Sequence, residues 1–167
     1  MSARKIAFNL LLAVALSGGL DAAAQDAGQN GEQRVSPEEV EWPPSATGGV
    51  GTSGVSGVQT VVLKGDPSKP GLYTLLLRAG PNIRALSHSH QDDRVATVIS
   101  GMWYIGYGDT FDEAGLKELP PGSFYTEPPG SNHFAMTKDE PVVIQITGMG
   151  PTSTTYVNPD DDPSRAR

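Results

Sequence analysis

Two histidines, His88 and His90, stand one residue apart in the middle of the chain. On a β-strand, side chains at positions i and i+2 point to the same face, so this spacing aims two imidazoles at one point. A third histidine, His133, follows the turn-forming sequence Pro-Pro-Gly-Ser-Asn. The chain has 3 histidines. A metal site built on His88, His90 and His133 would therefore use all the imidazole of the protein.

Cysteine is absent from the chain, so thiolates cannot compete as ligands. A metal site must consist of imidazole, carboxylate or water. Three neutral imidazoles on rigid strands leave coordination positions open, as in catalytic rather than closed structural sites. The alternative is that the histidines are ordinary core or surface residues, but their joint spacing favours metal. Imidazole suits several divalent ions, so Fe, Zn, Mn and Ni all remain candidates.

The elements that must position these histidines are short β-strands. Between Val58 and Val157, runs rich in β-branched and aromatic residues alternate with turns rich in Gly, Pro, Asn and Asp. This pattern is typical of an all-β sandwich or barrel. Residues 110–117 form one helical turn or an irregular loop. The predicted strands cover residues 58–63, 73–77, 83–90, 94–100, 102–107, 123–127, 133–137, 142–147 and 152–157.

The first histidine pair lies in a recognisable motif. Gly80, His88, His90 and Gly101 have the order of the first motif of the cupin superfamily, which the chain resembles. The gap from Gly80 to His88 is slightly longer than usual. Arg94 stands where that family carries a glutamate, judged by its spacing to Gly101.

The second motif of the same family reads Gly-x5-Pro-x-Gly-x2-His-x3-Asn. Gly122, Pro128, Gly130 and His133 match it with full spacing, and Thr137 replaces the final asparagine. Two spaced motifs that use every histidine make a specific signal. The resemblance implies a double-sheet jelly-roll barrel and a metal-binding function, and the composition of the residues before Val58 adds an N-terminal arm.

The chain differs from the family pattern at the position of the fourth metal ligand. Guanidinium has no acceptor atom, so Arg94 cannot replace the glutamate as a ligand. Asp92, Asp93 and Glu127 are the candidate substitutes. Arg94 either binds an anionic substrate or turns away and pairs with Asp92 or Asp93. Replacing Arg94 by glutamate is expected to restore a fourth ligand.

Two further residues are candidates for substrate binding. Gln145 is the polar residue within the apolar run 142–146, and it faces either the interior or solvent. Tyr104 and Tyr107 lie on opposite faces of one strand, so only one of them can reach the interior. Arg94, Gln145 and Tyr104 form the predicted substrate-binding set, and no general acid or base can be assigned.

The N-terminus predicts export. A basic start at Arg4 and Lys5 precedes an apolar run over residues 6–20, and Ala22 and Ala24 form a small-x-small cleavage site. Residues 1–24 are therefore a predicted signal peptide, and the alternative is an uncleaved anchor. Residues 25–57 form a predicted flexible arm, 58–157 the cupin domain and 158–167 a polar tail. Within the arm, Ser36-Pro37 is typical of a helix start, and Trp42 is predicted to dock on the barrel.

The net charge of the chain limits the kinds of macromolecule to which it can bind. The chain carries 12 basic and 19 acidic residues and a net charge of −7, without any basic run. Binding to the phosphates of nucleic acid is therefore disfavoured. No membrane partner is expected after signal cleavage. The aromatic strand 102–107 favours a homodimer.

Together these features predict an exported protein, periplasmic or secreted, that binds a divalent metal. The resemblance implies a more specific hypothesis, because some cupins with a three-histidine centre use dioxygen: a metal-dependent, dioxygenase-like enzyme acting on a small organic and possibly anionic substrate. The alternative is a non-catalytic cupin that binds or senses a small molecule and holds a structural metal. Fold alone does not decide between them.

Overall fold

The computed structural model describes residues 31–44 and 48–165, which divide into two units at Glu39 and Val40. The predicted signal peptide lies outside the described residues. In the first unit, the short 3₁₀ helix η1 (Pro37–Glu39) begins after Ser36, whose backbone N–H donates to Glu39 Oε2 at 2.7 Å. This capping contact confirms the predicted helix start.

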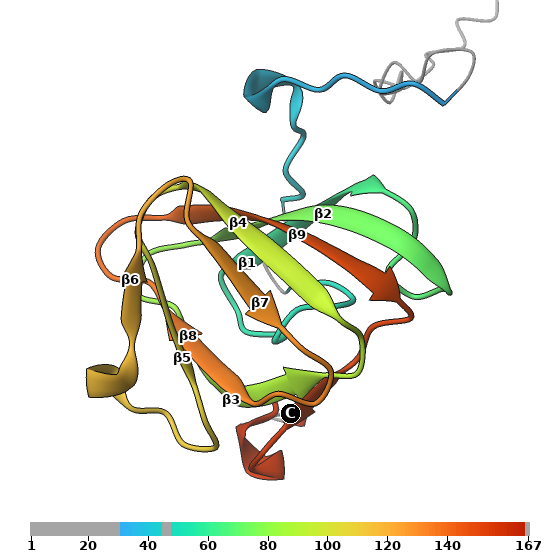
Figure 1. Cartoon of the computed structure of the whole chain (residues 1–167). Coiled ribbons are helices and arrows are strands. Elements are labelled where there is room, and N and C mark those ends of the chain that lie inside the picture. Colours follow the sequence, from blue (N-terminus) through green and yellow to red (C-terminus); the bar gives the residue numbers. More distant parts are fainter. Residues whose placement is uncertain (1–30, 45–47, 166–167) are drawn as a thin grey trace, which may run out of the picture. The chain divides into compact units, whose positions relative to one another are not determined.

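The second unit consists mainly of two five-stranded antiparallel sheets (Figure 1). Four of the five strands of the first sheet have seven to nine residues and are rich in Val, Ile, Leu and Thr, which suits a half-buried pleated surface. In spatial order, this sheet contains β1 (Val58–Lys64), β2 (Gly71–Ala79), β9 (Val142–Gly150), β4 (Arg94–Ser100) and β7 (Phe124–Glu127).

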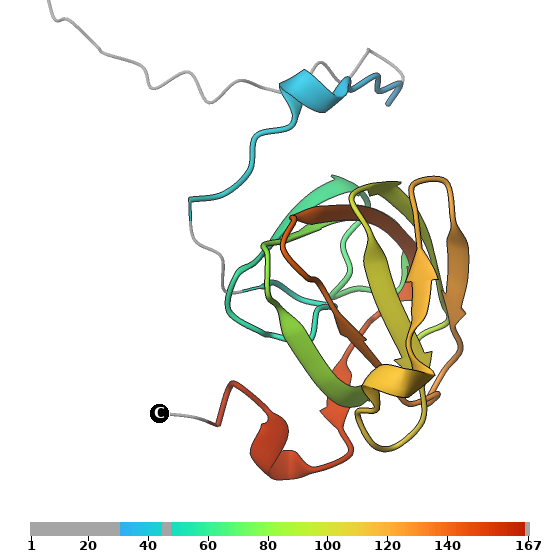
Figure 2. The ribbon, with the colours of Figure 1, turned by 90° about the vertical axis from the view of Figure 1, so that its left-hand side faces the viewer.

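The second sheet carries all three histidines. It consists, in spatial order, of β10 (Thr154–Tyr156), β3 (Arg84–His90), β8 (His133–Met136), β5 (Trp103–Tyr107) and β6 (Lys117–Leu119). In Figure 2 the C-terminal segment, drawn in red, lies below the sandwich and includes the short helix η3 (Pro159–Asp161). A third short helix, η2 (Glu113–Gly115), lies within the predicted helical turn 110–117.

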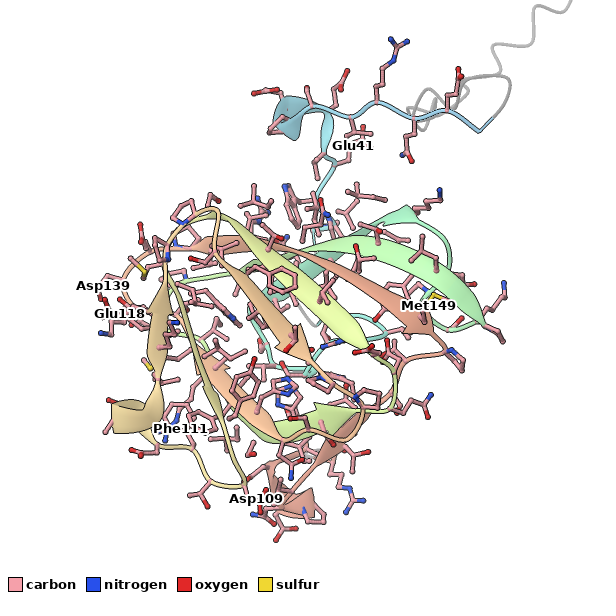
Figure 3. All side chains as sticks on the ribbon, in the orientation of Figure 1. Glu41, Asp109, Phe111, Glu118, Asp139 and Met149 are labelled. Carbon is pink, nitrogen blue, oxygen red and sulfur yellow. The ribbon has the colours of Figure 1, made fainter. Side chains whose placement is uncertain are left out.

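The two sheets pack face to face and do not join into a closed barrel. Side chains alternate strictly along β2 and β9, with one set buried between the sheets and the other on the outer face. Figure 3 shows the side chains of both sheets filling the space between them. This double-sheet jelly roll confirms the predicted all-β fold, and β9 extends three residues beyond the predicted strand 142–147.

An irregularity in β3 aims the histidines inward. The pairing of β3 with β8 runs from Ala85↔Ala135 to His88↔His133, so β3 holds one extra residue over this span. Without this β-bulge, Ala85 and His88 would point to opposite faces, because side chains alternate along a strand. With it, Ala85, His88 and His90 are all buried. The bulge lies in the interval from Gly80 to His88 that is longer than usual.

The compact unit begins at Val40, before the predicted domain start at Val58. Trp42 packs against the Arg78 guanidinium, with the ring centroid 4.4 Å from Cζ, as its predicted docking requires. Gln59 Nε2 donates to the Pro43 carbonyl. Residues 48–54, which we call the strap, pack over one end of the sandwich interior. No helix among the described residues is long and apolar enough to cross a membrane.

Candidate metal centre

The structure brings the three predicted metal ligands together. His88 and His133 are direct register partners on β3 and β8, and His90 lies two residues further along β3. All three side chains are buried, and one nitrogen of each lies within 4.8 Å of the corresponding nitrogens of the other two. The β3–β8 pairing therefore converges the imidazoles from both sequence motifs.

Each histidine has its Nδ1 fixed by a backbone carbonyl. His88 Nδ1 lies 2.7 Å from Leu86 O, His90 Nδ1 lies 2.9 Å from Ser153 O, and His133 Nδ1 lies 3.1 Å from Ser131 O. A carbonyl can only accept, so each Nδ1 carries the proton and donates. In the neutral imidazole Nε2 then keeps its lone pair, which is the state a metal ligand requires.

Burial keeps two of the imidazoles neutral. Burial lowers the pKa of His88 to about 4, with the neighbouring His133 acting in the same direction. Burial also lowers the pKa of His90 to about 2, helped by the charge of Arg94. Desolvation disfavours the charged form of a base, so both rings are unprotonated at neutral pH and available to an ion.

The arrangement also leaves one ring nitrogen without a partner. His90 Nε2 is fully enclosed and makes no hydrogen bond. A buried polar atom without a partner is costly unless something else satisfies it. A divalent cation bound by the three Nε2 atoms would satisfy it, so the residues present fit the metal that the sequence predicts.

Arg94 lies inside the sandwich and pairs with Glu127 rather than with Asp92 or Asp93. Its Nε donates to Glu127 Oε2 at 2.7 Å, and its Nη2 donates to the same oxygen. Arg94 and Glu127 are register partners on β4 and β7, which explains the contact. Local spacing does not predict this pair, because Arg94 and Glu127 lie 33 residues apart in the chain.

Glu127 reaches the histidines from the opposite sheet. Its Oε2 lies 3.7 Å from His90 Nε2 and 3.8 Å from His133 Nε2. Burial by itself raises the pKa of Glu127, but the charge of Arg94 outweighs it and the pKa falls to about 2. The carboxylate is therefore ionised within reach of two imidazoles.

The other predicted site residues lie elsewhere. Gln145 alternates with Ile144 and Ile146, which face the interior, so its side chain lies on the outer face of the first sheet. Tyr104 lies on the outer face of β5, where its ring contacts the Lys138 ammonium at 4.3 Å. Strand alternation thus removes the reason for assigning substrate binding to Gln145 and Tyr104.

The remaining candidate carboxylates do not reach the histidines either. Asp92 is buried, but its Oδ2 accepts the Tyr73 hydroxyl at 2.7 Å and it does not line the cavity. Asp93 is exposed. Glu127 is the one of the three proposed substitutes that faces the metal centre.

The histidines, Arg94 and Glu127 form the polar end of an internal cavity of about 40 Å³. The rest of its wall is largely apolar, with contributions from both sheets, including Leu77, Trp103 and Ile144. A water molecule needs about 10–15 Å³ of such space, so the cavity holds an ion with a few waters or a very small ligand.

The strap closes one side of this cavity. Gly51, Thr52 and Ser53 line it, and their carbonyl groups are held one after another by side chains of the sandwich. Gly51 O accepts from Arg94 Nη1 at 2.5 Å, Thr52 O from Thr154 Oγ1 at 2.7 Å, and Ser53 O from Tyr156 Oη at 2.5 Å. No sequence pattern had indicated a role for this glycine-rich segment.

Two positions of the second motif also have structural roles: Thr137, which differs from the family pattern, and Gly130, which matches it. Thr137, which replaces the asparagine, is fully buried and donates to Gly80 O at 2.6 Å while accepting from Ile83 N at 2.9 Å. Gly130 has a φ of 70°, which favours glycine, and its N–H donates to His90 O at 2.8 Å. These contacts tie each motif to the other.

Comparison with known proteins gives structural neighbours only. No protein-family model matches the chain, and no curated protein matches it significantly.

The polyketide cyclase RemF from Streptomyces resistomycificus superposes with a TM-score of 0.57 at 15% identity, covering 81% of this chain and 94% of that one. An RmlC-like cupin from Shewanella frigidimarina NCIMB 400 gives 0.51 at 17% identity, with 71% and 90% covered. A structure of the DMSP lyases RdDddP and RnDddQII gives 0.50 at 19% identity and covers 59% of this chain. The chain spans only 52% of that lyase chain. The chain therefore adopts the fold of the cupin superfamily, as its two sequence motifs predicted.

Proposed function

We propose that this protein is an exported, divalent-metal-dependent enzyme that acts on a small organic substrate. One observation carries the proposal. Three buried histidines have every Nδ1 hydrogen-bonded to a carbonyl, and one ring nitrogen of each lies within 4.8 Å of the corresponding nitrogens of the other two. Nothing in a purely structural core requires that arrangement, whereas a metal centre does.

His88, His90 and His133 would hold the ion, and Fe, Zn, Mn or Ni all suit imidazole ligands. When bound, such an ion supplies a Lewis acid that polarises a substrate oxygen and acidifies water. The apolar wall of the cavity excludes bulk water, which strengthens electrostatic interactions at the polar end. The cavity volume of about 40 Å³ limits the substrate to a small molecule unless the strap moves.

Arg94 contributes to substrate binding less directly than the sequence suggested. Three of its N–H groups are already committed, two to Glu127 and one to Gly51. An anionic substrate would therefore bind mainly to the metal ion, and only the remaining N–H groups of Arg94 could contact it. We retain a dioxygenase-like reaction as the first to test, because three imidazole ligands leave positions for two further small molecules.

The test is metal analysis of protein purified without a histidine tag. We expect about one equivalent of a divalent metal, lost on replacing His88 or His133 by alanine, while the circular dichroism spectrum is unchanged. Gln91→Ala, an exposed neighbour on the same segment, is the control and should keep the metal. Full metal content in both histidine variants would show that the site is wrong.

The reaction class is tested next, with protein reconstituted anaerobically with Fe(II). We expect dioxygen uptake that depends on one member of a panel of small carboxylic acids. Turnover without dioxygen would instead favour a lyase or a cyclase, the activities named for two of the structural neighbours.

One observation favours a second function, a non-catalytic small-molecule binder with a structural metal. The strap closes one side of the cavity and leaves little free volume. A binder of this kind would retain its metal against a chelator for days and show ligand binding without turnover.

Export is tested by N-terminal sequencing of protein recovered from the periplasm of an expression host. The alanine site at Ala22 and Ala24 predicts a mature chain that begins near Gln25. An intact Met1 in that fraction would contradict signal cleavage.

A further inference from the structure

Glu127 lies where a metal bound to the histidines can contact it. Its Oε2 is 3.7 Å from His90 Nε2 and 3.8 Å from His133 Nε2. Two donor atoms that share one ion at bond lengths of about 2.0–2.2 Å can lie at most about 4.4 Å apart. Both measured distances fall within that limit. One ion can therefore bind Glu127 and these two imidazoles with little rearrangement.

The carboxylate is also held in place. Arg94 is only 3% exposed and Glu127 only 4%, and two guanidinium N–H groups converge on Oε2. Arg94 is in turn fixed by its Nη1, which donates to Gly51 O. A planar guanidinium locked at both ends sets the orientation of its partner carboxylate. Oε2, the oxygen that Arg94 holds, is also the oxygen that faces the imidazoles.

We propose that Glu127 is the fourth protein ligand of the metal, and that Arg94 is the positioning residue that fixes its carboxylate. This inference rests on the proposed function, because it presupposes a metal at the histidines. The resemblance places a glutamate at position 94 on β4. This chain carries arginine there and supplies the carboxylate from the register partner on β7. The carboxylate thus comes from the neighbouring strand of the same sheet.

Arginine at position 94, with the carboxylate supplied by Glu127, changes the charge that the protein contributes to the metal centre. A glutamate at position 94 would by itself reduce the net charge of a divalent site by one. Here the Arg94 cation balances the Glu127 anion, and an imidazole that binds a metal ion is a neutral ligand. The protein therefore contributes no net charge, and the ion keeps its full attraction for an anionic substrate or for hydroxide.

The competing explanation is that Arg94 and Glu127 form a structural ion pair beside a three-histidine centre. The two explanations differ in what happens when both charges are removed together. Arg94→Met combined with Glu127→Gln leaves no unpaired buried charge, so its effect on folding is smaller than that of either single change. A structural pair beside the centre predicts a loss of metal affinity below about 100-fold in this double variant, and a ligand predicts a larger loss.

The experiment uses the full chain, stripped with a chelator and titrated with Co(II) in competition with a chromophoric chelator. We expect the double variant to bind Co(II) at least about 100-fold more weakly than the unmodified chain, the upper end of what loss of an outer-shell partner alone costs. The visible d–d bands of bound Co(II) should also shift, because one oxygen ligand is lost. Circular dichroism confirms that both proteins are folded.

Asp92→Asn is the matched control. It also removes a buried carboxylate, 5% exposed, but one that accepts the Tyr73 hydroxyl and does not face the histidines. Its Co(II) affinity and spectrum should equal those of the unmodified chain. If the double variant fails to fold, Glu127→Asp replaces it. The shorter aspartate side chain would keep the charge but withdraw the oxygen by one methylene, and should shift the d–d bands.

The outcomes separate this inference from the function on which it rests. If the unmodified chain takes up no Co(II), the metal-dependent function fails. If it binds Co(II), and the double variant or Glu127→Asp matches it in both affinity and spectrum, Glu127 is not a ligand while the three-histidine centre stands. Equal losses in the double variant and in Asp92→Asn would also overturn the assignment, because the effect would then be one of charge alone.

Discussion

At the scale of single residues, the site depends on buried polar side chains whose hydrogen bonds fix their orientation. Each imidazole gives Nδ1 to a carbonyl and keeps Nε2 free, and Arg94 gives two donors to Glu127 and a third to Gly51. Such groups are neutral or compensated although they are buried, which is the condition for keeping polar groups inside a sandwich.

The neutral histidines make the stability of the metal-free protein depend on pH. An unfolded histidine has a pKa of about 6.5, whereas the pKa is about 4 for folded His88 and about 2 for folded His90. Below pH 6.5 the unfolded chain therefore binds protons that the folded chain does not. The free energy of unfolding should fall by up to about 1.4 kcal/mol per pH unit for each of these histidines between pH 6.5 and 4.

Urea denaturation of chelator-treated protein from pH 7.5 to 4.5 measures this slope. His88→Asn removes one of the two groups and should reduce the slope by about half. A free energy of unfolding that stays constant over this window would contradict the burial of neutral imidazoles.

The Arg94–Glu127 pair reverses one expectation drawn from the sequence. Arg94→Glu was expected to restore a fourth ligand, but it would place two buried carboxylates in contact at the same register position. Breaking a buried ion pair by changing one partner costs about 3–5 kcal/mol. We expect Arg94→Glu to unfold at a much lower urea concentration, and the charge-swapped Arg94→Glu/Glu127→Arg chain to recover part of the loss. Stability of the single variant equal to that of the unmodified chain would rule out the pair.

At the scale of elements, the strap links the glycine-rich segment before β1 to the metal centre. Three consecutive carbonyls of the strap accept from Arg94, Thr154 and Tyr156, which lie on β4 and β10. Elements of both sheets therefore hold the strap in place. Access to the cavity and the orientation of Arg94 are coupled through Gly51.

Gly51 and Gly54 offer a matched test of the strap. Both have a positive φ, 85° and 72°, so alanine at either position costs about 1–2 kcal/mol of backbone strain. At Gly51 the added Cβ would also lie 2.8 Å from Thr152 Cγ2, whereas at Gly54 nothing lies within 4 Å. We expect Gly51→Ala to lower stability more than Gly54→Ala and to speed amide exchange across residues 48–54. Equal effects would mean that the strap does not pack as described.

At the scale of the whole molecule, charge is distributed unevenly for a chain of net charge −7. The strands of the first sheet contain one acidic residue, Glu127, and it points inward. The outer face of this sheet exposes large apolar side chains, among them Met149, labelled in Figure 3 near the end of β9. The most exposed of them are Leu72 at 49%, Ile99 at 47%, Phe124 at 61% and Met149 at 57%. Two copies of an acidic chain repel each other least when they contact through a face that is apolar and carries few acidic side chains.

The predicted homodimer is therefore expected to form through this sheet as well as, or instead of, the strand 102–107. Light scattering at micromolar concentration should give the mass of two chains, and Phe124→Asp should reduce it to the mass of one. Tyr107→Asp, at an aromatic residue on β5 that is 54% exposed, is the control. If Tyr107→Asp alone dissociates the dimer, the interface lies at the strand 102–107, as first predicted. A single-chain mass for the unmodified protein would contradict the dimer.

Local pattern was sufficient for much of this protein. Short runs of β-branched and aromatic residues separated by turn residues predicted the all-β sandwich, and the spacing within the two motifs selected the three residues that converge, His88, His90 and His133. These features depend on residues close together in the chain, where the periodicity of a strand and the conformation of a turn fix relative directions.

The rest was decided only by tertiary structure, because it depends on contacts that no local pattern encodes. The bulge in β3 sets which face His88 shares with Ala85, and the pairing with β8 reveals it. Glu127 and Arg94 are 33 residues apart and meet through the β4–β7 register, while Gly51 reaches Arg94 across 43 residues. Gln145 and Tyr104 were assigned to the cavity by residue type, and the inward direction of their neighbours excluded them. Register between distant strands thus selected the carboxylate that faces the metal centre.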